Sequence, residues 1–117
     1  MQIQINTDHN IEVHEALAAQ LRDTVATSLQ HFDERITRVE MHLSDENASK
    51  NGQNDKRCLL EARLNGRQPI AASFAAESLG QAVDGAAEKL ARSIESALGR
   101  AERSTAAADW SEPAEPE

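Results

Sequence analysis

The apolar residues of this 117-residue chain switch between two spacings, and this alternation limits the folds open to the chain. Ile3 and Ile5 alternate with polar residues, as in a strand with one buried face. From about residue 12 to residue 32 the spacing is three or four, without Pro or Gly, which is typical of an amphipathic helix. Strand-like alternation then returns, and a second helical pattern follows it. The sequence therefore predicts the order strand, helix, three strands, helix.

The middle of the chain holds the three consecutive predicted strands. The inward-facing residues are expected to be Thr37, Val39, Met41 and Leu43 in the first of these strands and Cys58, Leu60, Ala62 and Leu64 in the second. A polar stretch over residues 47–55 indicates a long hairpin loop between them. Asn65-Gly66 is a strong hairpin signal because both residues tolerate positive φ. The next strand, from Gln68 to about Ala75, is predicted to be an edge strand because it contains Pro69.

The last predicted helix, from about Ser78 to Arg103, separates its side chains into three arcs. Its apolar arc consists of Leu79, Val83, Ala86, Ala87, Leu90, Ile94, Ala97, Leu98 and Ala101. A basic arc of Lys89, Arg92, Arg100 and Arg103 borders it, and the acidic arc beyond consists of Glu77, Asp84, Glu88, Glu95 and Glu102. Two interpretations of the basic arc remain open: it binds an anionic partner, or its aliphatic stems cover the margin of the apolar face.

This order of elements predicts an α+β fold with two layers, β-α-β-β-β-α. The helix between the first two strands is a crossover, and the later strands form antiparallel hairpins, so the four-stranded sheet should be mixed. Both helices are expected on one face of the sheet. The other face should be open to solvent and lined by Gln2, Gln4, Arg38, Glu40, His42, Glu61 and Arg63.

Charge divides the chain into a body and a tail. Residues 104–117 hold four acids and no base, and their composition predicts a disordered acidic tail. Residues 1–103 are predicted to form the folded domain, in which 16 acids face 12 bases. Trp110 is the one large apolar residue of the tail; it is either an incidental exposed residue or a short docking motif for a protein partner.

Several classes of protein are disfavoured by the sequence. The four histidines lack the i,i+4 spacing of a helical metal site, and the single Cys58 lies on a predicted buried strand face, so neither a metal site nor a cofactor is expected. The sequence contains no phosphate-binding loop or nucleophile elbow, which predicts no catalytic residues and no enzyme. No apolar run reaches the roughly 20 residues that span a bilayer, and no leader pattern begins the chain, so a cytoplasmic protein is expected.

Three segments resemble the ribosome hibernation-promoting factors, also called ribosome-associated translation inhibitors. The segment Met1-Gln2-Ile3-Gln4-Ile5-Asn6-Thr7 with His9 to Leu17 resembles the start of that family. His31-Phe32-Asp33-Glu34-Arg35-Ile36 resembles the family's turn after the first helix, with one extra residue. The segment from Gln81 to Arg92 resembles its final helix. The resemblance covers residues 1–103 and implies the same layout of strands and helices.

The resemblance implies a function as well as a fold. Members of the family bind the small ribosomal subunit in the channel for mRNA and tRNA and silence translation in stationary phase or stress. The residues expected to contact rRNA are Arg22 on the first helix and Lys89, Arg92, Arg100 and Arg103 on the last. The alternative is a protein-binding module of the same fold, which would act through the open sheet face or the acidic tail.

Overall fold

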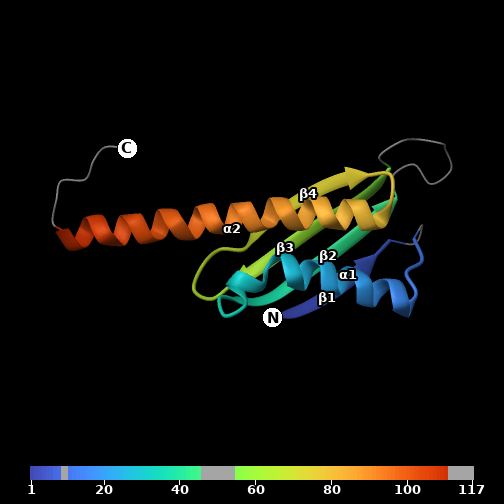
Figure 1. The fold of residues 1–117 in the computed structure, drawn as a ribbon, viewed down its shortest axis with the longest axis horizontal. Coiled ribbons are helices and arrows are strands. Elements are labelled where there is room, and N and C mark those ends of the chain that lie inside the picture. The colour runs from blue at the N-terminus through green and yellow to red at the C-terminus, as the bar shows by residue number, and fades with distance from the viewer. Residues whose placement is uncertain (9–10, 46–54, 111–117) are drawn as a thin grey trace.

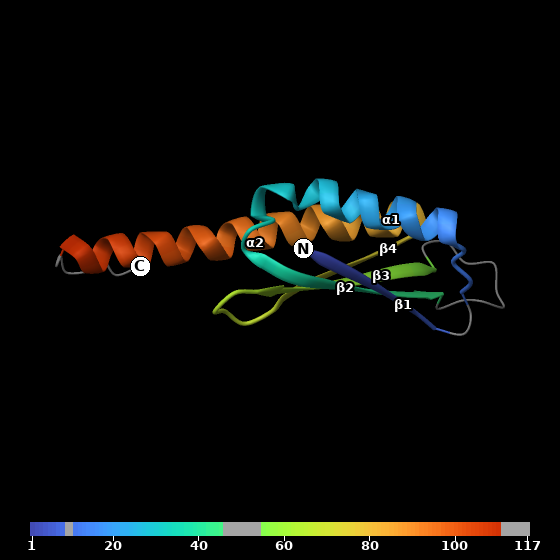
Figure 2. The ribbon, with the colours of Figure 1, turned by 90° about the horizontal axis from the view of Figure 1, so that it is seen from below.

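The computed structural model describes residues 1–8, 11–45 and 55–110, and the side chains as far as residue 99. Its elements are β1 (Gln2–Thr7), α1 (Glu15–Ser28), the 3-10 turn η1 (Gln30–Phe32), β2 (Ile36–Asp45), β3 (Lys56–Leu64), β4 (Ile70–Ala76) and α2 (Leu79–Trp110). The strands form one sheet in the order β1-β2-β3-β4. The pair β1-β2 is parallel, and the other two pairs are antiparallel. Both helices cover one face of the sheet (Figures 1 and 2), so the predicted two-layer α+β fold with a mixed sheet is confirmed.

The core lies between the sheet and the two helices. From α2 it includes Val83, Leu90 and Ile94, all within the predicted apolar arc and all fully buried. Ala82, which was not assigned to that arc, is buried as well. The four predicted inward residues of β3 are buried, and Cys58 among them is a core residue.

The start of β2 differs from the prediction at Thr37. A register shift between Ile36 and Arg38 places Ile36 in the core, whereas Thr37 is exposed and its hydroxyl donates a hydrogen bond of 3.1 Å to the carbonyl oxygen of Arg63. The prediction that Thr37 faces inward is therefore wrong. Strict alternation cannot anticipate an irregularity of this kind, because a bulge reverses which residues face the core.

Neither end of α1 has a strongly preferred capping residue. The helix begins later and ends earlier than the predicted range of about 12 to 32, because residues Gln30–Phe32 form a 3-10 turn. His14 is the N-cap: its Nδ1 accepts a hydrogen bond of 3.4 Å from the backbone N–H of Leu17.

Local residues explain where β4 begins and where α2 begins and ends. The turn before β4 contains Gly66 at a φ of 70°, as the Asn-Gly pair predicted, and β4 is an edge strand. The Ser78 hydroxyl oxygen accepts a hydrogen bond of 3.2 Å from the N–H of Gln81, which caps α2. α2 continues to Trp110, seven residues beyond the predicted end at Arg103. Ala106, Ala107 and Ala108 favour this extension, because alanine is the strongest helix former.

Two predicted segments lie partly or wholly outside the described residues. They are most of the loop at 47–55 and, in the tail, residues 111–117. Among the residues that the structure does describe, no helix combines the length and the apolar character needed to cross a bilayer.

Candidate functional site

Two members of the basic arc, Lys89 and Arg92, lie along the flank of α2 that borders β4. Lys89 and Arg92 line a hollow of about 460 Å³, together with Ile70 of β4 and Ser93, Ser96 and Ala97 of α2. Two bases therefore lie at a concave surface that also carries two serine hydroxyls. Such a surface suits an anion with several acceptor oxygens, such as a phosphate group of nucleic acid.

Lys89 is tied to the neighbouring strand. Its Nζ donates a hydrogen bond of 3.0 Å to the backbone carbonyl oxygen of Ser73 and lies 6.0 Å from the centroid of the Phe74 ring. The interaction with Ser73 occupies one carbonyl group on the edge of the sheet. Arg92, by contrast, is exposed one helical turn further on, and no hydrogen bond or ion pair holds its side chain within the described part of the chain.

The structure brings together some of the predicted rRNA-contacting residues and separates another. Lys89 and Arg92 share the hollow. Arg22 is exposed on α1, which lies along the other flank of α2 (Figure 1), so Arg22 does not join the hollow. Arg100 and Arg103 follow on the same helix, but their side chains lie outside the described residues.

The open face of the sheet carries a second group of charged residues. The strand register places Glu40 directly opposite Glu61 and Arg38 directly opposite Arg63. The ion pairs run along each strand instead of across it, from Arg38 to Glu40 and from Arg63 to Glu61. The hydrogen bond from Arg38 is the main reason why the pKa of Glu40 lies below its ordinary value.

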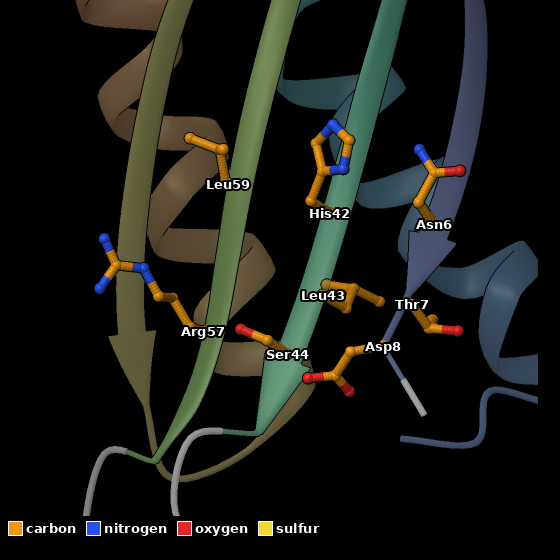
Figure 3. Close-up of a pocket in the computed structure, with 8 residues that line it drawn as sticks. All are labelled: Asn6, Thr7, Asp8, His42, Leu43, Ser44, Arg57 and Leu59. Atoms are coloured by element: carbon orange, nitrogen blue, oxygen red, sulfur yellow. The ribbon is translucent and has the colours of Figure 1, made fainter. Parts of the chain in front are cut away.

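A shallow pocket of about 390 Å³ lies at one end of this open face. It is lined by Asn6, Thr7, Asp8, His42, Leu43, Ser44, Arg57 and Leu59. Figure 3 shows Asn6, His42 and Leu59 on three adjacent strands, each on the face turned away from the helices. Leu59 is 39% exposed and is one of two large apolar residues that are exposed in the described part of the chain. A mixed polar and apolar surface of this kind suits a protein or peptide partner.

The one thiol of the chain is not part of either surface. Cys58 is buried beneath the helices, and this burial raises the pKa of its thiol to about 12. The thiol is therefore protonated at neutral pH, and a protonated thiol is a poor nucleophile.

Residues 3–102 match the sequence model of a family described as sigma 54 modulation protein / S30EA ribosomal protein. The chain belongs to this family. The resemblance to the ribosome hibernation-promoting factors is thereby confirmed. S30EA family members are ribosome-associated factors of translation regulation rather than enzymes, which agrees with the expectation that the chain is not an enzyme.

Solved structures agree on the fold of this S30EA family member. A ribosomal subunit interface protein from Coxiella burnetii aligns with a TM-score of 0.64 and 18% identity, over 85% of this chain and 99% of that one. The N-terminal domain of Protein Y from Thermus thermophilus aligns with a TM-score of 0.57 and 21% identity, over 80% of this chain and 96% of that one. At these identities the likeness shows the fold alone. A search of curated proteins finds no match.

Proposed function

We propose that this protein binds the small ribosomal subunit through rRNA, in the channel for mRNA and tRNA, and silences translation in stationary phase or stress. The observation that carries the proposal is the family match over residues 3–102, which supports association with the ribosome. The names of the two structural neighbours, a ribosomal subunit interface protein and Protein Y, point in the same direction. We infer a cytoplasmic location, because that is where ribosomes translate.

The flank of α2 that holds Lys89 and Arg92 is the surface we propose for rRNA. It offers positive charge and hydroxyl donors at one hollow, and Arg100 and Arg103 continue the same helix. The opposing effect is the net charge of residues 1–103, where acids outnumber bases by 16 to 12. Screening favours the nearby bases, since the Debye length at physiological ionic strength is about 8 Å and distant acids then contribute little.

An alternative function is favoured by the open sheet face. The pocket beside Leu59 and His42, together with the exposed apolar surface of Leu59, would suit a protein partner, and the sequence around Trp110 offers a second contact for one. A protein docked on this face would depend on salt less steeply than an RNA-bound one, because it releases fewer condensed counterions.

Co-sedimentation with purified small ribosomal subunits at increasing salt tests the proposal. The variant Arg92→Glu/Arg100→Glu should lose binding, because it replaces two bases on the proposed surface with acids. The control is Arg63→Glu, which reverses one base on the opposite face of the sheet, where Arg63 is exposed, and it is compared with the single variant Arg92→Glu as well as with the double variant. This control should bind like the parent.

The outcome separates the two functions. If the α2 double variant binds as well as the parent and Arg63→Glu does not, the open sheet face is the interface and the RNA-binding proposal is wrong. Inhibition of a cell-free translation reaction by the parent, and its loss in the α2 variant, tests the silencing step. Circular dichroism of the variants should match the parent, since Arg92 and Arg63 are exposed and Arg100 falls outside the apolar arc predicted from the helical period.

A further inference from the structure

The register of β2 and β3 creates an electrostatic problem on the open sheet face. Glu40 and Glu61 are direct partners across the antiparallel pair, and like charges in that position repel. Arg38 and Arg63 are the next like-charged partners along the strands, and their positive charges repel each other as well. A cation bound between the two carboxylates would attract both of them and offset their repulsion.

His42 adds a nitrogen ligand to this acidic pair. It lies two residues from Glu40 on β2, and alternate residues of a strand share a face. The distance from its Nε2 to Glu40 Oε1 is 3.5 Å. One ligand atom from each of Glu40, His42 and Glu61 lies within 4.8 Å of the others. The expectation of no metal site was drawn from helical spacing, whereas on a strand the relevant spacing is i,i+2.

We propose that Glu40, His42 and Glu61 form a binding site for a divalent first-row transition ion, of which Zn²⁺ is the representative. One imidazole nitrogen and two carboxylate oxygens are a donor set that suits Zn²⁺ and its neighbours better than Mg²⁺ or Ca²⁺, which prefer oxygen ligands. Zinc binds these atoms at about 2.0–2.2 Å, so the three side chains must move closer by small rotations. Three protein ligands leave a coordination position open to water.

The two arginines compete with the metal for the carboxylates, so both must turn away for the metal to bind. The side chain of Arg38 is 40% exposed and that of Arg63 is 49% exposed, so both can turn into solvent. The pair between Arg63 and Glu61 is largely exposed and contributes little to stability, whereas the pair between Arg38 and Glu40 is partly buried and is the stronger competitor. Within the described residues, Arg38 Nε is buried without a hydrogen-bond partner, which makes the present arrangement of Arg38 less favourable.

Isothermal titration of the full chain, carrying no histidine tag, with Zn²⁺ tests this site. The parent should show saturable binding at one site, and His42→Ala should weaken that binding by about tenfold or more, because a direct ligand is lost. Glu61→Gln keeps the shape of the side chain and should weaken binding as well. Its fold should be about as stable as the parent's, because the substitution removes the repulsion with Glu40 together with the weak, largely exposed ion pair to Arg63. Loss of binding in a variant of undiminished stability cannot result from misfolding.

The matched control is His31→Ala, which removes an exposed histidine from η1. It should leave Zn²⁺ binding unchanged. Co²⁺ in place of Zn²⁺ gives a second readout: its visible absorption bands should appear with the parent and be absent with His42→Ala. The proposal is wrong if His42→Ala binds Zn²⁺ as tightly as the parent, or if the parent shows no saturable binding up to about 1 mM.

Discussion

Phe74 lies against Gly85 so closely that a Cβ atom at position 85 would be 2.3 Å from Cδ2 of the ring. The glycine therefore lets α2 approach the edge strand β4, and the ring fills the space that a side chain would need. Because the contact also includes Cγ of the ring, at 2.5 Å, rotation of the ring about its own axis cannot relieve it.

We expect Gly85→Ala to destabilise the fold in spite of alanine's higher helix propensity. The propensity gain is about 1 kcal/mol, whereas overpacking costs about 1–3 kcal/mol. In a Phe74→Ala background the overlap is gone, and the same substitution should stabilise. Urea denaturation of the four proteins of this double-mutant cycle measures the coupling. The control is Gly80→Ala, at a helical position with open space around it, which should not destabilise. A stabilising Gly85→Ala in the parent would contradict the packing described here.

Leu90 anchors α2 to the sheet. It is fully buried and belongs to the central core. Leu90→Ala should lower the free energy of unfolding by about 2–5 kcal/mol, which combines the lost burial with the cavity left behind. That is a large share of the stability of a domain of this size. Chemical denaturation measures it, with the exposed Ser93→Ala on the same helix as the control. An unchanged midpoint for Leu90→Ala would show that this face of α2 does not pack as described.

The sequence predicts this helix well because one helical period fixes which side faces the core. Leu90 and Ile94 fall at the centre of the predicted arc, and both are fully buried. The positions of Lys89 and Arg92 on one flank follow from the same period. What lies opposite that flank does not follow from it, since the contact between Lys89 and Ser73 depends on how the helix is placed over β4.

On the open face, too, the sequence predicts which way the side chains point but not which residues lie opposite one another. Alternation predicts that Glu40, His42 and Glu61 all point away from the helices. Only the register of β2 against β3 makes Glu40 and Glu61 direct partners. The loop between these strands is long, so its length does not fix the register as a tight hairpin would. The irregularity at Thr37 escaped prediction for a related reason, because a bulge has no reliable signature in a single sequence.

The buried thiol of Cys58 should be unreactive in the folded protein. Burial raises its pKa from the ordinary value of 9.0 to about 12, so almost no thiolate is present near neutral pH. A thiol reagent should modify the chain slowly at about pH 8 and rapidly once urea unfolds it. Rapid modification of the native protein would show that Cys58 is accessible.

The raised pKa of the Cys58 thiol also makes the free energy of unfolding depend on pH. Between about pH 9 and 12 the unfolded chain loses the thiol proton while the folded chain keeps it, so the free energy of unfolding falls as pH rises through that window. The fall should be shallower in Cys58→Ala, which has no thiol to ionise.

Residues 104–117 are predicted to be dispensable for folding, although α2 continues to Trp110. The reason is composition: apart from alanines and Trp110, the segment has no apolar residue to bury. A chain ending at Arg103 should keep a thermal midpoint close to that of the full chain. The control is Trp110→Ala in the full chain, which should also leave the midpoint unchanged. A loss of several degrees in either protein would show that the end of the chain packs on the domain.

Lys89 and Arg92 share one hollow, but they should contribute differently to stability and to binding. Lys89→Gln removes the hydrogen bond to Ser73 and the cation above Phe74, so it should lower the free energy of unfolding by about 0.5–1.5 kcal/mol. Arg92→Gln removes a charge without such contacts and should change stability by less than about 0.5 kcal/mol. If Arg92 contacts a phosphate of rRNA, the plot of log binding constant against log salt should become shallower by about 1 in Arg92→Gln. Denaturation and salt titration of both variants measure the two effects. Equal stabilities would contradict the structural role of Lys89, and an unchanged slope in Arg92→Gln would remove this arginine from the RNA-binding surface.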